Sequence, residues 1–457
     1  MSKLISTNPA RNYEIVGEVA ISADEDIKRK VALANAVKKK WKEMGIEKRI
    51  QLLTPVGEEF KVRASEIAEI ITKEMGKPIK ESIREVNGDV GEFDWYLKHI
   101  PEALKDEITF QDKKTLHKIV YEPYGAAAVI SPWNFPFGVT ISVIASNLIA
   151  GNVVIFKISE ECPLTGKLME EIINNHGLPP GVFSEVYGAG DVGEKLAKSD
   201  IDLICFTGST RTGQSLYKIA ADKFIKAILE MGGSNPCIIF EDADLDKAIP
   251  IIYKGRFSNC GQVCVSIKRL LIHESIFDET LKRLENLIKT KRIGDPMNQD
   301  TDMGSLAAKR QLLLLQEQVK DAVNKGAKII KGKEICENLK GAYYPQTILT
   351  DISQEMRVWK EEVFGPVLSV IKFKTEEEAI ALANDTIYGL GSRVFSKNIE
   401  RAERVASQIQ AGTVEINEGN RWHPFNPFGG YKKSGMGRQQ GTLGFRELCQ
   451  IKVVSIG

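Results

Sequence analysis

From about residue 125, short apolar runs alternate with segments whose apolar positions recur at helical spacing. The runs are short enough for buried strands, and the intervening segments, such as GKLMEEIINNHG at 166–177, have the periodicity of amphipathic helices. Strands that alternate with helices favour a parallel, doubly wound sheet, so this part of the chain predicts an α/β unit. The runs are AAAVISP (126–132), NVVIFK (152–157), VFSEVYG (182–188), DLICFTGS (202–209) and NPCIIF (235–240).

A second set of the same kind predicts a second α/β unit. Strand-like runs stand at 269–276, 326–332 and 366–373, with helical patterns through residue 290 and at 376–389. Alternation at the end of 99–121 predicts a hairpin arm, and QIKVVSIG at the C-terminus predicts an edge strand.

The N-terminal quarter predicts helices. Ser22 stands three residues before Glu25, which is the spacing of a capping box. The positions that follow it with helical spacing are Ile27, Val31, Ala34 and Trp41.

Composition and charge exclude several classes of function. The chain has 457 residues, of which 43% are hydrophobic and 27% charged, an ordinary globular composition. With 62 basic and 61 acidic residues its net charge is +1, so no overall field attracts nucleic acid or anionic lipid. It has no run of 18 apolar residues and no leader pattern at its start, so we expect a cytoplasmic protein. Its seven scattered cysteines are expected to be free thiols.

Two glycine-rich turns are candidate phosphate-binding sites. GAGDVG at 188–193 matches a dinucleotide fingerprint, but a plain glycine turn explains it equally well, because no acidic residue is clearly placed to hold a ribose. DLICFTGSTRTG at 202–213 is the better candidate, since a strand runs into Gly208 and Ser209, where free N–H groups at a helix start suit a diphosphate. Neither turn ends in Gly-Lys-Ser/Thr, so ATP chemistry is not expected.

The stretch RFSNCGQVC at 256–264 holds two cysteines four positions apart. A zinc site would need a second close pair of ligands, which the isolated histidines do not supply, so no metal is expected. Cys260 is most simply a small buried residue. Cys264 follows a polar glycine turn, where a nearby helix start would stabilise its thiolate, and is a candidate nucleophile. Its activator would be a carboxylate such as Glu230, although a single glutamate can equally be a solvated side chain.

Seven motifs in one order resemble the NAD(P)-dependent aldehyde dehydrogenase superfamily, and the resemblance covers essentially the whole chain. It implies an α/β fold with a Rossmann-type cofactor domain (1–98 and 122–231) and an α/β catalytic domain (232–427) that contains Cys264. It also implies a small β oligomerisation arm (99–121 and 447–457) and a return segment (428–446). The motifs are SPWNFP (131–136), FTGSTRTG (206–213), LEMGGSNP (229–236), CGQVC (260–264), EEVFGPV (361–367), NDTIYGL (384–390) and PFGGYKKSGMGR (427–438).

The resemblance implies roles for individual residues. Cys264 would attack the carbon of a small-molecule aldehyde, the Asn134 amide and the Cys264 N–H would stabilise the oxyanion, and Glu230 would activate the water that hydrolyses the thioester. Homodimers or homotetramers are implied, with no nucleic-acid or membrane partner.

The cofactor positions follow from the same resemblance. Lys157 and Glu160 would hold the adenosine ribose, and because a carboxylate there repels a 2′-phosphate, NAD is favoured while NADP can be accommodated. This chain has Ile158 where the family usually has proline. The remaining cofactor positions are Trp133, Gly190, Gly208, Ser209, Glu362 and Phe364.

The substrate pocket is expected to be apolar and to be lined by Phe135, Ser142 and Phe428. The short N-terminus and WYLKHIPEALKDE are similar to the short succinate-semialdehyde dehydrogenases, which makes succinate semialdehyde the named substrate. That group carries an arginine near position 142 that pairs with the substrate carboxylate. Ser142 cannot do this, so Arg421 or His423 would have to replace it. The alternative is a broad specificity for aliphatic or aromatic aldehydes.

Other functions stay open from the residues alone. An acylating relative that uses coenzyme A typically lacks a base such as Glu230, a cysteine hydrolase would need a well-placed histidine, and a structural relative would not need to retain the whole set of site residues. If the segment 260–264 is helical, Cys260 and Cys264 would be close enough to couple on oxidation, a hypothesis from spacing alone.

Overall fold

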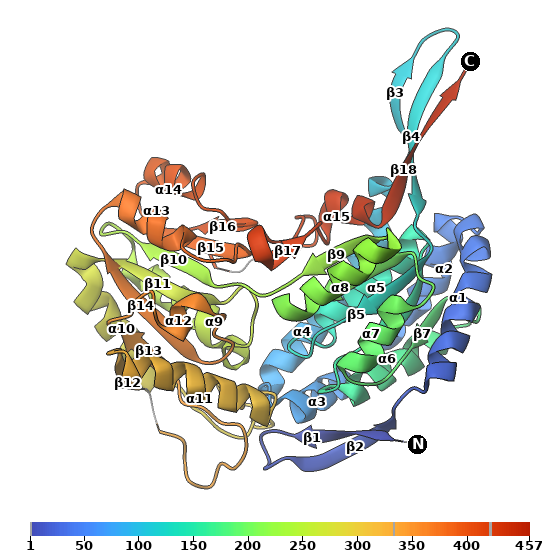
Figure 1. The fold of residues 1–457 in the computed structure, drawn as a ribbon. Coiled ribbons are helices and arrows are strands. Elements are labelled where there is room, and N and C mark those ends of the chain that lie inside the picture. The colour runs from blue at the N-terminus through green and yellow to red at the C-terminus, as the bar shows by residue number, and fades with distance from the viewer. Residues whose placement is uncertain (1, 332–333, 420–422) are drawn as a thin grey trace.

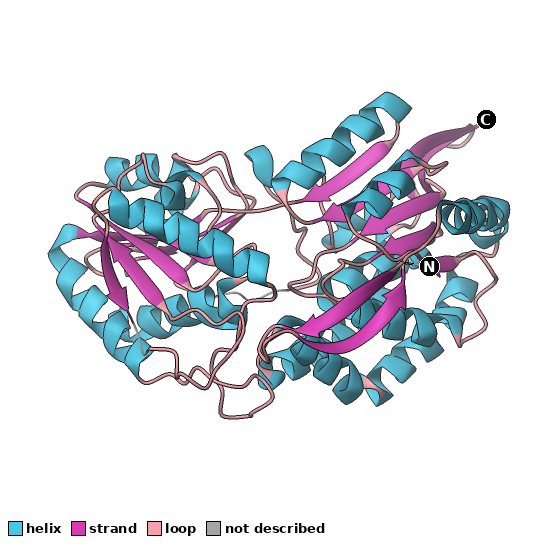
Figure 2. Ribbon diagram, turned by 60° about the horizontal axis from the view of Figure 1, so that its bottom comes forward, coloured by secondary structure: helices cyan, strands magenta, loops and turns pink. Residues whose placement is uncertain are grey.

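The computed structural model describes residues 2–331, 334–419 and 423–457. Two lobes lie side by side, each built around a mainly parallel sheet flanked by helices, and a narrow three-stranded sheet projects from the first lobe (Figures 1 and 2). The α/β fold predicted from the alternating pattern is confirmed.

The sheet of the first lobe has six strands within the described ranges, in the order β17-β9-β8-β5-β6-β7. Neighbouring strands are parallel except β17, which pairs antiparallel with β9. The strands carry the predicted apolar runs. The elements are β5 (Ala126–Ile130), α5 (Gly138–Ala150), β6 (Val153–Lys157), α6 (Pro163–Asn174), β7 (Phe183–Glu185), α7 (Gly190–Lys198), β8 (Leu203–Thr207), α8 (Thr210–Lys223), β9 (Lys226–Glu230) and β17 (Gly435–Met436).

The N-terminal part supplies a hairpin and four helices to this lobe. The predicted apolar stripe of the first helix is buried. The capping-box prediction is wrong: the helix begins after Ala23, and the Ser22 hydroxyl instead accepts the Tyr187 N–H at 3.0 Å, which ties the helix start to the loop after β7. The elements are β1 (Lys3–Asn8), β2 (Glu14–Ala20), α1 (Asp24–Glu43), α2 (Ile46–Val62), α3 (Ala64–Met75) and α4 (Ile79–Ala103).

The sheet of the second lobe has seven strands in the part of the chain that is described, in the order β12-β13-β14-β11-β10-β15-β16. Only β12 is antiparallel to its neighbour. The elements are β10 (Asn235–Ile239), α9 (Leu245–Phe257), η1 (Ser258–Gly261), β11 (Ile267–His273), η2 (Glu274–Ile276), α10 (Phe277–Lys289), α11 (Lys309–Asn324), β12 (Lys328–Lys331), β13 (Thr347–Thr350), α12 (Arg357–Lys360), β14 (Val367–Phe373), α13 (Glu376–Asn384), β15 (Gly391–Phe395), α14 (Ile399–Ala406) and β16 (Thr413–Ile416).

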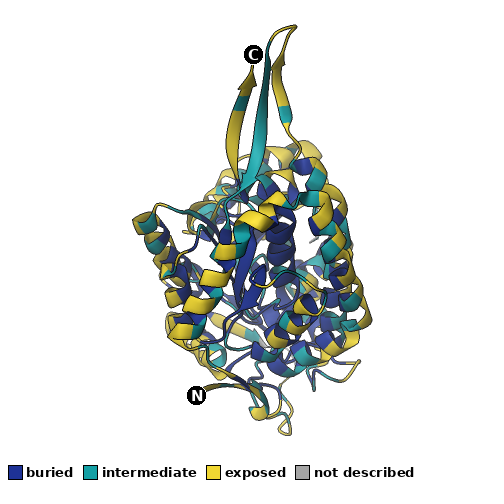
Figure 3. Ribbon diagram, turned by 90° about the vertical axis from the view of Figure 1, so that its right-hand side faces the viewer, coloured by how far each residue is buried: buried dark blue, intermediate teal, exposed yellow. Residues whose placement is uncertain are grey.

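The projecting arm joins a hairpin to the C-terminal strand. β3 (Glu107–Gln111) and β4 (Leu116–Pro123) form the hairpin, and β18 (Cys449–Ile456) pairs along the other side of β4, as an edge strand. The predicted arm boundary at residue 99 falls inside α4, which continues to Ala103. Side chains of both outer strands are largely exposed (Figure 3), so the arm adds little to the core of its own lobe.

The core is divided between the lobes. One large apolar cluster fills the first lobe, and three smaller clusters fill the second. The short links η3 (Lys432–Ser434) and α15 (Gly441–Glu447) bring the chain back, and Phe445, Leu448 and Cys449 pack in the first cluster. Among the described residues, no helix is both long and apolar enough to cross a membrane.

Candidate active site

A cavity of about 420 Å³ lies where the two lobes meet. The first lobe contributes Phe135, Ser142 and Glu230 to its lining, the second lobe contributes Cys264, and the return segment contributes Phe428. Residues predicted separately for nucleophile, base and substrate pocket therefore line one space.

Cys264 lies in a turn between η1 and β11, and its side chain is partly exposed. It does not stand at a helix start as the sequence suggested, because Asn259 and Cys260 adopt left-handed backbone angles (φ 49° and 55°) that end the helical path. The segment that carries Cys264 therefore does not supply the helix start that was expected to stabilise its thiolate. Burial raises the pKa of the Cys264 thiol to about 11, with Lys268 acting in the opposite direction and Glu362 and Glu230 adding to the increase.

Cys260 belongs to a different environment. It is 1% exposed and packs in an apolar cluster of the second lobe, and its sulfur lies 3.9 Å from the Gly304 carbonyl oxygen. It is a buried packing residue, as predicted. The hypothesis of a redox pair assumed that residues 260–264 form one helix, and the structure contradicts this assumption.

Glu230 is the last residue of β9 and is 2% exposed. In the described structure neither of its carboxylate oxygens has a hydrogen-bond partner. Burial raises the pKa of this carboxyl well above its usual range, although the nearby Arg438 lowers it. The return segment approaches closely, because a Cβ at Gly429 would lie 2.8 Å from Glu230 Oε1. The solvated-glutamate alternative is thereby excluded.

Asn134 lies beside the nucleophile segment. Its side-chain amide donates to the backbone carbonyl of Gln262 at 3.0 Å. The backbone carbonyl of Asn134 accepts hydrogen bonds from Lys77 Nζ at 2.9 Å and from Asn259 Nδ2 at 2.8 Å. Lys77 forms a buried ion pair with Glu85. The other oxygen of Glu85 accepts the N–H groups of residues 137 and 138 at the start of α5. This network fixes the segment that carries Asn134.

The predicted cofactor residues gather at the carboxyl ends of the parallel strands. β5 and β8 are neighbours, while the chain proceeds from β5 towards β7 in one direction and from β8 to β9 in the other. Such a reversal opens a crevice in which open α/β sheets bind ligands. Trp133 follows β5, Lys157 ends β6, Gly190 follows β7, and Gly208 and Ser209 follow β8.

Lys157 and Glu160 face each other, with Nζ 3.5 Å from Oε2. Burial lowers the pKa of Lys157, because a charged ammonium loses solvation there. The pKa of Glu160 is lowered although burial raises it, because Lys157 and other donors outweigh the burial. A cation beside an anion suits the hydroxyl groups of a ribose.

The turn after β8 differs from its prediction in one respect. The Gly208 N–H donates to the Glu230 carbonyl at 2.9 Å and is therefore not free for a phosphate. The Ser209 hydroxyl caps α8 by accepting the Thr212 N–H at 3.3 Å. The sequence could not show this use of Gly208, because its partner lies on the neighbouring strand.

The loop before β14 brings Glu362 to Lys268 and Phe364 to Trp133. Glu362 Oε1 lies 2.6 Å from Lys268 Nζ and accepts the Gly233 N–H at 3.1 Å. The rings of Phe364 and Trp133 meet edge to face, with centroids 5.4 Å apart.

Comparison with known proteins identifies the family of this chain. The family model "Aldehyde dehydrogenase family" matches residues 2–454. The chain belongs to the aldehyde dehydrogenase family. It is 36% identical over 460 residues to chloroplastic betaine aldehyde dehydrogenase of Beta vulgaris (98% of this chain, 92% of the relative). It is 34% identical over 422 residues to succinate-semialdehyde dehydrogenase [NADP(+)] of Deinococcus radiodurans (92% and 88%).

A solved structure of the same family has the same fold. The crystal structure of betaine aldehyde dehydrogenase from Staphylococcus aureus in complex with NAD+ matches with a TM-score of 0.94 and 33% identity, covering 100% of this chain and 91% of that one. As a family member the protein is an NAD(P)-dependent oxidoreductase that acts on an aldehyde group.

For three predicted site residues of this aldehyde dehydrogenase, Arg421, His423 and Gly190, the structure gives little evidence of a role. Arg421 lies outside the described residues. His423 lines the cavity and stacks on Phe425. A Cβ at Gly190 would meet nothing within 4 Å, so no contact within the chain explains glycine there. Within the described ranges, no group of three or more His, Cys, Asp or Glu side chains could hold a metal ion.

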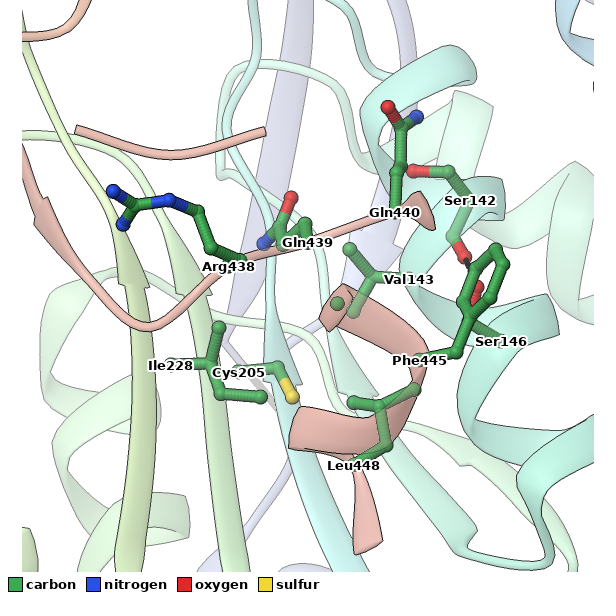
Figure 4. A pocket seen from close by; sticks show the side chains of 11 residues that line it. Ser142, Val143, Ser146, Cys205, Ile228, Arg438, Gln439, Gln440, Phe445 and Leu448 are labelled. Carbon is green, nitrogen blue, oxygen red and sulfur yellow. Dashed lines mark hydrogen bonds between the residues drawn. The ribbon is translucent and has the colours of Figure 1, made fainter. Parts of the chain in front are cut away.

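Ser142 lines both the main cavity and a smaller one of about 20 Å³, which is room for a single water molecule. Figure 4 shows the side chains that line the smaller cavity. The two cavities share Ser142, Gln439 and Gln440. The small cavity continues between α5, β8 and α15, where Cys205 and Phe445 line it. A larger side chain at position 142 would therefore change the depth of the main cavity.

Sequence reasoning missed the buried charged residues around the site, chiefly Lys77, Glu85, Arg256 and Lys268. Lys268 stands immediately before the strand-like run predicted at 269–276, and the structure includes it in β11, which begins at Ile267. A lysine buried in a strand needs partners. The sequence offered no means of naming those partners.

Proposed function

We propose that this enzyme oxidises an aldehyde to the carboxylic acid with NAD, through a thioester on Cys264. The overall reaction is aldehyde plus NAD+ plus water to carboxylic acid plus NADH plus one proton. The observation that carries this proposal is that Cys264 and Glu230, from different lobes, line one cavity of about 420 Å³.

The first step needs a thiolate and a stabilised oxyanion. With a pKa of about 11, the Cys264 thiol is protonated at neutral pH, so attack requires a base in the cavity. Glu230 lines the same cavity, and its raised pKa makes its carboxylate a better proton acceptor than an exposed one. The Asn134 amide and the Cys264 N–H would donate to the oxyanion that forms when sulfur adds to the carbonyl carbon.

The residues at the strand ends fit NAD. Lys157 and Glu160 would hold the adenosine ribose, and the Glu160 carboxylate disfavours a 2′-phosphate. The Ser209 turn and Gly190 would face the diphosphate and adenine, while Glu362, Phe364 and Trp133 would hold the nicotinamide end. Bound there, the cofactor supplies the acceptor for the two electrons that leave the substrate carbon.

Hydrolysis of the thioester completes the reaction. After the proton taken from the thiol has passed to solvent, Glu230 would take a proton from water, the hydroxide oxygen would add to the thioester carbonyl, and the Cys264 thiolate would leave as the carboxylic acid forms. A carboxylate next to Gly232 and Gly233 on one side and Gly429 on the other has the freedom to move between these two tasks.

Two variants test the proposal. Cys264→Ser should abolish NADH production. Glu230→Gln removes the base of both steps, so it should lower NADH production at neutral pH and slow the hydrolysis of any acyl group that forms on Cys264, which mass spectrometry of the intact protein detects. NADH production by the Cys264→Ser variant at the wild-type rate would refute the proposal.

Succinate semialdehyde is the substrate that the sequence resemblance favours. Its carboxylate would need a cation near the far end of the cavity. Two arginines of the cavity lining are described, Arg84 and Arg393, and Arg393 already lies 2.7 Å from Glu415. Arg84 is exposed and is therefore the described candidate for binding a carboxylate. A large increase in KM for succinate semialdehyde in Arg84→Gln, with an unchanged KM for an apolar aldehyde, supports this substrate.

An aldehyde that carries a positive charge is a second candidate, favoured by one observation. Three carboxylates on one side of α4, Glu85, Asp89 and Glu92, line the cavity. Glu85 is paired with Lys77, and burial together with Glu85 and Glu92 raises the pKa of Asp89 well above its usual range. An ammonium group at this wall would be attracted by it, whereas a substrate carboxylate would be repelled. Betaine aldehyde, which carries a quaternary ammonium, should then be preferred, and Asp89→Asn should remove the preference.

The exposed arm supports the proposal of a dimer or tetramer. Ile108, Phe110, Ile451 and Val453 on its outer strands are between 51% and 67% exposed. Apolar side chains that gather on an edge strand are typical of interfaces. Ile451→Glu with Val453→Glu should lower the molar mass that light scattering measures in solution.

A further inference from the structure

Lys268 is a buried cation that touches the nucleophile segment. It is the second residue of β11 and is 1% exposed. Its ammonium donates to the Cys264 carbonyl at 2.8 Å and to Glu362 Oε1 at 2.6 Å, and it lies 5.4 Å from the centroid of the Phe364 ring. Burying an ammonium is costly unless it is paired and hydrogen-bonded, and here all its polar contacts are with residues of the site.

Glu362 is held from several sides. The Gly233 N–H donates to the same oxygen as Lys268, and a Cβ at Gly232 would lie 2.1 Å from the other carboxylate oxygen. The residues after Glu362 are held by Arg256, which donates to the carbonyls of Val363, at 3.1 Å, and of Gly365. The loop that carries Phe364 is thus pinned, and Lys268 is the link from it to Cys264.

We propose that Lys268 is a positioning residue that joins the nucleophile segment to the loop expected to hold the nicotinamide ribose, acting through the Cys264 carbonyl and the Glu362 carboxylate. This inference rests on the proposed role of Cys264 as the nucleophile. It has two consequences: the Cys264 backbone is fixed relative to Glu362, and the negative charge of Glu362 is compensated next to the thiol.

The charges around the thiol define what Lys268 changes. Apart from burial, Lys268 on β11 lowers the pKa of Cys264, whereas Glu362 on its loop and Glu230 on β9 raise it. The pKa of Lys268 is lowered mainly by burial, and the nearby Arg256 on α9 lowers it further. Arg438 faces Glu230 rather than Lys268. Lys268 is therefore the cation that offsets two carboxylates at the thiol.

The test is the pH dependence of Cys264 alkylation by iodoacetamide in the cofactor-free enzyme. A Cys336→Ser background removes the exposed cysteine, and peptide mass spectrometry assigns the modified residue. Lys268→Met should shift the alkylation profile to higher pH by about one pH unit, since it removes an opposite charge near the thiol. Lys268→Arg should restore most of the shift, and Glu362→Gln alone should shift the profile to lower pH.

A matched control is Lys372→Met, which removes another lysine that lies over an aromatic ring, 4.3 Å from the Phe277 centroid and remote from the cavity. Its profile should equal that of the wild type. If Lys268→Met lowers the alkylation rate equally at every pH, or if Glu362→Gln shifts the profile upwards, the inference is wrong. The alkylation profile of Glu362→Gln tests the inference even if the Lys268→Met variant does not fold.

The inference and the proposed function fail in different ways. If Cys264→Ser still produces NADH, the proposed function is wrong whatever the alkylation profiles show. If Cys264 is required for NADH production and is the residue alkylated, but its profile is the same in wild type, Lys268→Met and Glu362→Gln, only the inference about Lys268 is wrong.

Discussion

The buried ion pair of Lys77 and Glu85 offers the sharpest test of how this site is held. The two side chains are 1% and 2% exposed. Replacing Lys77 by methionine leaves the Glu85 carboxylate buried without its cation and leaves the Asn134 carbonyl without one of its two donors. Breaking a buried pair in this way costs about 3–5 kcal/mol of unfolding free energy. For a unit of about 150–250 residues that corresponds to a Tm lower by roughly 6–20 °C.

The same change should affect catalysis by a separate route. Because Lys77 and Glu85 fix the segment from residue 134 to the start of α5, Lys77→Met should lower kcat more than it raises the KM for NAD. The double variant Lys77→Met with Glu85→Gln removes the uncompensated charge, so it should recover much of the lost Tm but not the lost kcat.

Differential scanning calorimetry and steady-state kinetics together measure both effects. The control is Lys39→Met, because Lys39 pairs with Glu43 at 3.8 Å on an exposed surface, where an ion pair contributes little. The reasoning is refuted if Lys77→Met changes Tm no more than Lys39→Met does, or if the double variant recovers kcat together with Tm.

Three further predictions concern the residues around the thiol. Gly429→Ala should lower kcat and allow the acyl-enzyme to accumulate, as detected by intact-protein mass spectrometry, because its Cβ would lie 2.7 Å from Arg438 Cδ and 2.8 Å from Glu230 Oε1. Cys260→Ser should destabilise the protein by about 1–3 kcal/mol in thermal unfolding, since it buries a hydroxyl in an apolar cluster, but inactivation by peroxide that a thiol reductant reverses should survive unchanged. NADH production should rise as pH increases in a pH–rate profile, because burial raises the pKa of Glu230 and its carboxyl must lose its proton before it can accept one from the Cys264 thiol. For Glu230 the linkage to stability has the opposite sign: its folded-state pKa exceeds its unfolded one, so its contribution to stability is present below the unfolded pKa and is lost as pH rises through the folded one.

The strands were predictable because their residues are apolar almost without interruption. In β5, β6 and β10 every residue is buried, and such runs between glycine or proline turns are the strongest local signal in the sequence. The carboxyl ends of these strands then place Trp133 and Lys157 at one edge of the sheet. The motifs supplied the order in which the residues occur, and the topology brought them together.

The errors arose where a local pattern competed with a distant partner. Ser22 has capping-box spacing, but its hydroxyl is used by a residue 165 positions away. The Gly208 N–H is taken by the neighbouring strand. The environment of Cys264 depends on Lys268, which is close in sequence, and on Glu362, 94 residues beyond Lys268. Sequence spacing alone does not show any of these long-range contacts.

Lys77, Arg256 and Lys268 share one arrangement: each is a buried cation whose donors reach backbone carbonyls of a site segment. Arg256 shows that burying such a cation is unfavourable. Burial lowers the pKa of its guanidinium to about 9, and among the described atoms its Nε has no hydrogen-bond partner. Replacing such a cation together with its partner by apolar side chains of similar volume is often neutral or stabilising. Carbonyl groups, however, accept hydrogen bonds only from donors at defined places, so a cation fixes a loop where an apolar residue only fills space. The geometry of this site is therefore held by interactions that apolar packing could replace in stability but not in position, so variants that remove both partners of a pair should lose kcat while they keep most of the stability of the fold.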